Sequence, residues 1–377
     1  MITLAEGQIP EVRVEGDYAI VAITKHGVEI ARTLGQSFQN ADVYYMSKLA
    51  KRDEERRGIQ LFEGSVRLLF PALFPAYKGL IVIISLGAVV RMIAPLLQDK
   101  KVDPAVVVID DKGEHVISVL SGHLGGANEL THEVAASLGA RPIITTASDV
   151  GQTIPVDLFG KRFGWVWDSA SALKLTPVSA AVVNEEAVAI VQESGEKTWW
   201  EYDRPLPGHF SVYASVEEAL SVGGFSATLV ITHRLLEDAV SRQILENGVL
   251  YRPKVLALGI GCNRGTSAEE IGAVIDETLV ELGFSKKCVK AICTIDLKKD
   301  EVGLLEVAER HGWEFVYYSP EVLNSVKIKD PSETVFKYTG AYGVSEPAVM
   351  LYSGACELAL VKKKSGNVTI SVGVIQH

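Results

Sequence analysis

Hydrophobic and polar positions in the first third of the chain alternate between the periods typical of strands and of helices. Continuous apolar runs at residues 80–86 and 104–109 predict strands that are buried on both faces of a sheet. Apolar residues recur at helical spacing over 28–34 and 65–74. Strands that alternate with helices in this way predict an α/β fold, with a three-layer α/β/α sheet.

The same pattern continues around a glycine-rich turn. Residues 115–120 alternate like a half-buried strand and follow a hairpin turn at 111–113. Downstream, Ala127, Leu130, Val134 and Leu138 recur at helical spacing. A short strand beginning at Arg141 then ends in small hydroxyl residues. The sequence therefore predicts a strand, a tight turn and a helix in succession.

The composition and the pattern of predicted elements change twice more along the chain. Tryptophan-rich and proline-rich stretches between 151 and 250 indicate a smaller α/β domain, with a helix from Ser179, a strand at 227–232 and a charged helix opening at His233 and Arg234. A new series begins after Pro253, with strands at 254–260, 289–295, 315–318 and 368–375 and helices at 267–282, 301–310 and 346–361. We therefore predict a multi-domain α/β protein with domains at 1–150, 151–250 and 251–377, and a three-layer sheet in the first and last.

The turn at residues 121–130, SGHLGGANEL, carries the first candidate chemistry. Gly122, Gly125 and Gly126 permit a tight turn, and the first N–H groups of the following helix could bind an anion. His123 can act near neutral pH as an acid, a base or an oxyanion donor. A closed turn in which His123 and Asn128 bond to the backbone is equally compatible with these residues. The spacing matches neither GxGxxG nor GxxxxGK[ST], which disfavours an ordinary dinucleotide or P-loop site.

Other polar residues follow predicted strands. Arg91, after a turn at Gly87, could grip a carboxylate or cap the strand. Thr145, Thr146, Ser148 and Asp149 either face a ligand crevice or cap a helix and a turn. A second glycine-rich stretch, GIGCNRGTS, precedes a helix whose predicted capping box pairs Ser267 with Glu270, and Arg264 places a positive charge there. The tryptophans of the middle domain either pack a core or line a groove.

Composition excludes several classes of protein. The 377 residues are 47% hydrophobic and 22% charged, as in globular proteins, and the formal charge of −10 disfavours nucleic-acid binding. Four cysteines without a CxxC pair predict reduced thiols and a cytoplasmic protein. The amino terminus lacks a signal pattern, and the apolar run at 79–90 is shorter than the ~20 residues of a membrane helix. We therefore expect neither export nor a membrane partner.

Motifs throughout the chain resemble those of the CbiG family of anaerobic cobalamin (vitamin B12) biosynthesis. They are LGAVVRMIAP, KVDPAVVVID, SGHLGGANEL and PIITTASD in the first part, and LGIGCNRGTS, TIDLKKDEVGL, YGVSEPA and NVTISVGV in the last. The last domain alone resembles the separate CobE protein. The resemblance implies a hydrolase that acts on cobalt-precorrin-5A, a cobalt-bound, ring-contracted tetrapyrrole. Water would open its δ-lactone, and acetaldehyde would then be expelled to give cobalt-precorrin-5B.

This chemistry assigns expected roles to the candidate residues. His123 is the expected base, and the N–H groups of Gly125 and Gly126 are the expected oxyanion donors. The absence of a GxSxG motif favours direct attack by water. The cations Arg91, Lys101 and Arg264 are expected to face the substrate's carboxylate arms. The full set of expected substrate-binding residues is Gly87, Arg91, Lys101, Ser121, Gly122, Gly125, Gly126, Asn128, Thr145, Thr146, Gly259, Gly261, Arg264 and Glu346.

Cobalt would arrive inside the substrate, so we expect no cofactor and no metal site in the protein. Two alternatives remain open, a non-catalytic tetrapyrrole carrier and a nucleotide-binding α/β enzyme. A homo-oligomer is also compatible with the sequence.

Overall fold

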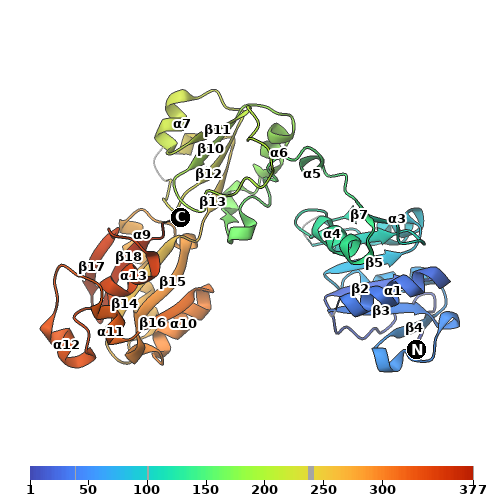
Figure 1. Cartoon of the computed structure of the whole chain (residues 1–377), viewed down its shortest axis with the longest axis horizontal. Helices are drawn as coiled ribbons and strands as arrows, with labels where there is room; N and C mark the ends of the chain where they lie inside the picture. Colours follow the sequence, from blue (N-terminus) through green and yellow to red (C-terminus); the bar gives the residue numbers. More distant parts are fainter. Residues whose placement is uncertain (39, 100–101, 237–241, 377) are drawn as a thin grey trace. The chain divides into compact units, whose positions relative to one another are not determined.

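The computed structural model describes residues 1–377 except 39, 100–101, 237–241 and 377. The chain divides into two compact units, Met1–Thr153 and Ile154–His377 (Figure 1). The first unit contains one sheet of eight strands, and the second contains two sheets of five strands each. The predicted multi-domain α/β fold is therefore confirmed. The boundaries near residues 150 and 250 stay predictions.

The sheet of the first unit has the strand order β1-β4-β3-β2-β5-β6-β7-β8. All neighbouring strands are parallel except β6 and β7, so that β7 and β8 run against the other six. The carboxyl ends of β7 and β8 therefore lie on the side of the sheet at which β5 and β6 begin. The strands are β1 (Ile2–Thr3), β2 (Tyr18–Ala22), β3 (Ala41–Met46), β4 (Gln60–Glu63), β5 (Gly79–Ile83), β6 (Ala105–Ile109), β7 (His115–Leu120) and β8 (Arg141–Ile143).

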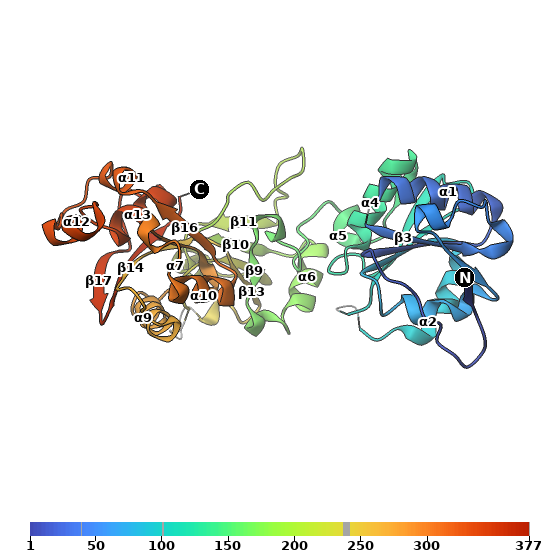
Figure 2. The same cartoon turned by 90° about the horizontal axis from the view of Figure 1, so that it is seen from below.

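Helices cover both faces of this sheet (Figure 2). On one face, α1 (Lys25–Ser37) and α4 (Ala127–Leu138) pack against the strands through a cluster that includes Val28 and Leu130. On the other, α2 (Phe70–Leu73) and α3 (Leu86–Ile93) pack through Phe70 and Val89. The helix predicted over 65–74 is shorter than expected because Pro71 has no N–H to continue an earlier helix. A four-residue helix, α5 (Ala147–Val150), follows β8.

The second unit begins with a sheet of order β11-β10-β12-β13-β9. Its strands are β9 (Val166–Trp167), β10 (Val188–Gln192), β11 (Phe210–Tyr213), β12 (Ala227–Ile231) and β13 (Gly248–Arg252), with helices α6 (Leu175–Val183) and α7 (Val216–Val222). Trp165 is buried in the core, and the other three tryptophans of this region are partly buried against the same cluster. The predicted charged helix falls partly on 237–241, outside the described residues, and Arg234 itself forms an isolated bridge with Phe284.

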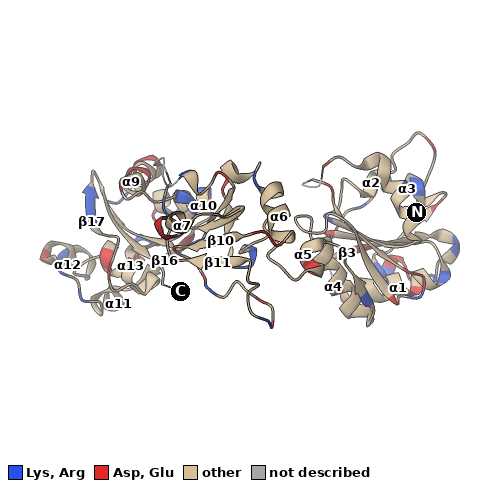
Figure 3. Ribbon diagram, turned by 90° about the horizontal axis from the view of Figure 1, so that it is seen from above, with Lys and Arg blue, Asp and Glu red and all other residues tan. Residues whose placement is uncertain are grey.

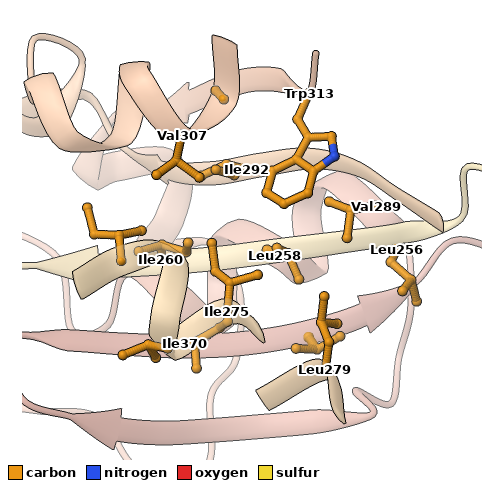
Figure 4. Packing of buried hydrophobic residues seen from close by; sticks show 14 of the residues in the cluster. Leu256, Leu258, Ile260, Ile275, Leu279, Val289, Ile292, Val307, Trp313 and Ile370 are labelled. Carbon is orange, nitrogen blue, oxygen red and sulfur yellow. The ribbon is translucent and has the colours of Figure 1, made fainter. Parts of the chain in front are cut away.

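The last sheet has the order β16-β15-β14-β18-β17, in which β14, β15 and β16 are parallel. Its strands are β14 (Leu256–Cys262), β15 (Val289–Ile295), β16 (Glu314–Tyr318), β17 (Leu360–Ser365) and β18 (Val368–Val374). On one face, α9 (Ala268–Glu281) and α10 (Val302–His311) contribute Ile275 and Val307 to the core that Figure 4 shows around Leu258. The other face carries α11 (Pro320–Asn324) and α13 (Ser345–Ser353), and α12 (Glu333–Thr339) lies between them in the chain. The predicted three-layer arrangement is confirmed.

Three local predictions in this region are wrong. The helix predicted to reach residue 361 ends at Ser353, because Gly354 adopts a left-handed conformation that caps it, and residues 360–365 form β17 instead. The capping box is only half formed: Ser267 accepts the N–H of Glu270, whereas the Glu270 carboxylate accepts the N–H of Asn367. Finally, β14 continues to Cys262, two residues past the predicted end, so that Gly261 lies in a strand and not in a turn.

None of the helices within the described ranges combines the length and the apolar character that crossing a bilayer requires.

Candidate functional site

The turn that joins β7 to α4 folds back tightly on itself. It begins at Ser121, a non-glycine residue with a left-handed φ of 58°, and its Oγ donates to the carbonyl of Asp103 at 2.9 Å. A Cβ on Gly125 would lie 2.3 Å from the Cβ of Ser121, so only glycine permits this approach. Left-handed residues other than glycine are costly and gather at functional sites. The backbone therefore marks this turn as a candidate site.

Backbone N–H groups at the start of α4 are bonded within the turn. Gly126 donates to the carbonyl of His123 at 2.9 Å, Ala127 to Ser121 at 3.1 Å and Asn128 to Gly122 at 3.0 Å. The expected role of the Gly126 N–H as an oxyanion donor is therefore wrong in this structure, because that donor is already used. The N–H groups of Ala127 and Asn128 are likewise used within the turn and are not available to an anion. The N–H of Gly125 takes part in none of these three bonds.

A carboxylate and a hydroxyl meet the imidazole of His123 at one nitrogen. Its Nε2 lies 2.9 Å from Oδ2 of Asp149 and 3.0 Å from Oγ of Ser148. A carboxylate can only accept, so Nε2 carries the proton and Nδ1 is the basic nitrogen. The side chain of His123 is 19% exposed and that of Asp149 is 38% exposed. The pair is thus ordered by contacts and still within reach of a ligand.

A buried amide holds Asp149 in turn. Asn128 is 7% exposed, and its Nδ2 donates to Oδ2 of Asp149 at 3.1 Å and to Oγ1 of Thr146 at 2.8 Å. Ser118 in β7 donates to Oδ1 of Asn128 at 2.7 Å. The expected contact of Asn128 with substrate is therefore replaced by contacts with protein side chains.

Ser148 and Asp149 did not belong to the expected site. The sequence predicts crevice residues or caps at these positions, after a strand. Because β7 and β8 run in the same direction, the residues that follow β8 lie beside the turn that follows β7, and thus beside His123. Ser148 is only 6% exposed, and it shares Nε2 with the carboxylate. In a hydrolytic triad, nucleophile and acid contact opposite ring nitrogens. The arrangement does not make Ser148 an accessible nucleophile.

Gly87 and Arg91 do not join this cluster. They belong to α3, after the carboxyl end of β5, whereas Ser121 follows the carboxyl end of the antiparallel β7. The two ends lie at opposite edges of the sheet. Gly87 is helical, not the predicted turn, and its carbonyl accepts from Nη1 of Arg91 at 2.9 Å. Lys101 lies outside the described residues. Thr145 is exposed between β8 and α5, near the His123 edge.

The other expected residues belong to the second unit. Gly259 pairs with Ser371 in the sheet, and a Cβ there would lie 1.8 Å from the carbonyl oxygen of Ser345. Gly261 lies two residues further along the same strand. Arg264 is 62% exposed and donates to Oδ1 of Asp300 at 2.7 Å. The predicted ligand turn is therefore a strand packed against a helix, beside a surface ion pair.

Glu346 lies in the first turn of α13 and is buried. Burial raises the pKa of its carboxyl, which a hydrogen bond from the backbone N–H of Lys329 and the ammonium group of Lys362 partly oppose. Lys362 belongs to β17, whose basic residues Figure 3 shows in blue. No group of three or more metal-ligating side chains is found in the part of the chain that the structure describes.

Three models of one family match successive parts of the chain: Cobalamin synthesis G N-terminal at residues 69–149, Cobalamin biosynthesis central region at 154–253 and Cobalamin synthesis G C-terminus at 256–373. A cobalt-precorrin-5A hydrolase of Priestia megaterium is 70% identical over 377 residues, which cover 100% of both chains. A cobalt-precorrin-5A hydrolase of Salmonella typhimurium is 31% identical and covers 94% of this chain and 97% of its own. Protein CobE of a Sinorhizobium species is 31% identical over 110 residues, 29% of this chain and 71% of CobE.

Proposed function

The chain belongs to the CbiG family of cobalamin biosynthesis, and we propose that it hydrolyses cobalt-precorrin-5A with His123 as the general base. The full-length match to hydrolases of that name confirms the predicted hydrolase function. The match to CobE confirms the resemblance predicted for the last domain. Lactone opening, acetaldehyde release and the roles of individual residues are the proposal developed below.

Lactone opening needs a base that activates water. The water oxygen bonds to the lactone carbonyl carbon while its proton passes to Nδ1 of His123. When the tetrahedral intermediate collapses, the ring C–O bond breaks and the leaving oxygen takes a proton from the imidazolium. Asp149 stabilises the imidazolium through its contact with Nε2 at 2.9 Å. The N–H of Gly125 is the remaining candidate in the turn for the developing oxyanion.

Acetaldehyde release requires a second set of proton transfers. A hydroxyl loses its proton as its carbon becomes the aldehyde carbonyl, and the adjacent carbon–carbon bond breaks. The electron pair of that bond takes up a proton at the ring carbon. His123 can accept the first proton and return one to the ring, so a single imidazole supports both steps. Cobalt is carried by the substrate, and we propose no other cofactor.

The observation that carries the proposal is the contact between His123 and Asp149 in a turn built by a left-handed residue. A histidine held by a carboxylate is the usual form of a general base, because the carboxylate fixes the tautomer and stabilises the charged form. A carrier has no need of such a pair. A cytoplasmic location and the state of oligomerisation stay predictions.

The deciding experiment supplies the purified protein with cobalt-precorrin-5A under anaerobic conditions and measures acetaldehyde. We expect one equivalent of acetaldehyde per substrate converted. Substrate that is bound but chemically unchanged would instead support a tetrapyrrole carrier. Thermal stabilisation by nucleotides would support the nucleotide-binding alternative.

A variant at Ser148 tests direct attack by water. We expect Ser148→Ala to retain most of the turnover, because the serine is buried and shares Nε2 with Asp149. A covalent intermediate would instead appear as a trapped acyl-enzyme, with an increased mass, in the parent protein. If Ser148→Ala lost both this intermediate and the turnover, attack by water would be contradicted.

A further inference from the structure

The side chain of Asn128 connects three elements of the first unit. It projects from α4, accepts a hydrogen bond from Ser118 of β7 at 2.7 Å and donates to Thr146 at 2.8 Å, ahead of α5. Its second donated bond, at 3.1 Å, ends on Oδ2 of Asp149. That oxygen is the same one that lies 2.9 Å from Nε2 of His123. Asn128 therefore meets the carboxylate at the atom that meets the imidazole.

The orientation of this amide is fixed by its neighbours. Because the carboxylate of Asp149 can only accept, the NH₂ group must face Asp149 and Thr146, and Oδ1 is left to accept from the hydroxyl of Ser118. The side chain is 93% buried, being 7% exposed, so water cannot readily replace these partners. A flipped amide would place a carbonyl oxygen against the carboxylate. The contacts thus select one rotamer of Asn128 and one position of Asp149.

From this geometry we infer that Asn128 is a positioning residue: it holds Asp149 so that His123 keeps its proton on Nε2 and Nδ1 stays the basic nitrogen. The inference rests on the proposed role of His123 and extends it to a residue that touches neither the substrate nor the imidazole. It replaces the expected role of Asn128 in binding substrate. Without the amide, Asp149, which is 38% exposed, turns towards solvent, and the imidazole samples both tautomers.

Gly122 supports the same arrangement from the other side. A Cβ at this position would lie 2.8 Å from Oδ1 of Asn128, closer than side chains approach. The glycine thus makes room for the amide, which explains one glycine of the motif without any contact to a ligand. Gly122→Ala displaces Asn128 and leaves every polar group of the network in the chain.

The first test measures the tautomer of His123 in the free protein. Nitrogen-15 chemical shifts of the ring report which nitrogen is protonated, and we expect Nε2–H in the parent protein. In Asn128→Leu we expect a mixture of the two tautomers, with turnover lowered about 10- to 100-fold, the usual cost of losing a residue that orients a site group. Asn40→Leu is the matched control, because the Nδ2 of Asn40 also donates to a carboxylate, that of Asp17 at 2.7 Å, on the exposed surface.

The second test uses Gly122→Ala. We expect the same mixture of tautomers and a fall in turnover, as in Asn128→Leu. A single Nε2–H tautomer in both variants would overturn the inference. A fall in turnover that follows only the loss of folded protein would overturn it as well, since a purely structural role leaves the tautomer of the folded fraction unchanged.

The tautomer measurement needs no substrate, so the two ideas can fail separately. Full activity in a variant without His123 would contradict its role as the base. The tautomer measured in Asn128→Leu would still decide whether Asn128 orients the imidazole. A pure Nε2–H tautomer in Asn128→Leu, combined with an inactive His123→Ala, would retain the base and remove the positioning role.

Discussion

Two glycine-rich stretches of this chain look alike in sequence and differ in what their glycines do. Around His123, Gly122 and Gly125 make room for side chains, and the result is a partly buried polar cluster at the end of a strand. Around Arg264, Gly259 makes room for the backbone of α13, and the result is close packing of a helix on a sheet. A glycine motif therefore indicates close approach, and the approaching group decides whether chemistry follows.

The two stretches also differ in where their charged groups point. Asp149 faces an imidazole that is accessible to a ligand, whereas Asp300 faces the guanidinium of Arg264 on the surface. The first arrangement prepares a group for proton transfer, and the second neutralises two charges. We therefore expect variants of the first stretch to affect turnover and variants of the second to affect stability.

His123→Ala should break the first stretch with the largest effect. We expect turnover to fall by about two to four orders of magnitude, the contribution of a positioned base, with the melting temperature nearly unchanged. Single-turnover lactone opening and a thermal melt measure the two quantities. His115→Ala is the matched control, because His115 also pairs with an aspartate, Asp110, on the surface of the same unit. Normal turnover in folded His123→Ala would contradict the proposed base.

A partly buried histidine of the second unit, His233, should give that unit its own pH response. Burial lowers the pKa of His233 to about 4, so below its ordinary pKa of about 6.5 the unfolded chain binds a proton before the folded chain does. Stability should therefore be complete above pH ~6.5 and fall by about 3 kcal/mol as the pH drops to about 4.

The tryptophans make this measurable by fluorescence, because all five (Trp165, Trp167, Trp199, Trp200 and Trp313) lie in the second unit. Urea unfolding followed by tryptophan fluorescence should show the loss between pH 6.5 and 4, and His233→Phe should flatten the response. An equal pH response in the variant would assign the effect to other groups.

Gly259→Ala should separate the packing role from a ligand role. The added Cβ would meet the carbonyl oxygen of Ser345 at 1.8 Å, and overpacking of this kind costs about 1–3 kcal/mol of stability. At Gly261 the nearest atom is 3.8 Å away, so Gly261→Ala should cost much less. Tryptophan fluorescence during denaturation measures both variants. Equal stability of the two would contradict the packing explanation.

Arg264→Ala should have the smallest effect. The guanidinium must give up part of its pairing with Asp300 to reach a substrate carboxylate, so we expect substrate binding to weaken by no more than about threefold, and less at high salt. The dissociation constant at two salt concentrations measures it. A much larger loss of affinity would support the substrate-binding role of Arg264 that the sequence predicts. Asp300→Ala would then be expected to tighten substrate binding.

Much of the fold could be predicted because apolar periodicity fixes elements locally. The runs that became β5 and β6, and the helical spacing that became α4, needed no knowledge of distant contacts. The ends of elements were harder to predict. Gly354 stops α13 eight residues before the predicted end, and the residues beyond it form a strand only because β18 is available to pair with them.

The candidate site could be predicted only in part. His123 was identified from its place in the glycine turn, but its partner Asp149 is 26 residues away and lies in α5, after another strand. The direction of β7 decides which other residues lie near His123. Because β7 is antiparallel to β6, Arg91 lies at the opposite ends of the strands from His123, and Asp149 lies at the same ends. Strand direction depends on pairing between segments, which a local pattern does not contain.

The shortness of β8 has a dynamic consequence. This edge strand pairs with β7 over three residues only, from Arg141 to Ile143, and the next element in the chain is α5, which carries Asp149. Few ladder bonds need to open before α5 and its carboxylate separate from the imidazole, so local unfolding of this segment costs far less free energy than global unfolding. The histidine follows β7, which is paired on both sides, whereas its partner follows the edge strand β8. Opening of this segment would separate the proton-transfer pair and leave the core of the sheet folded.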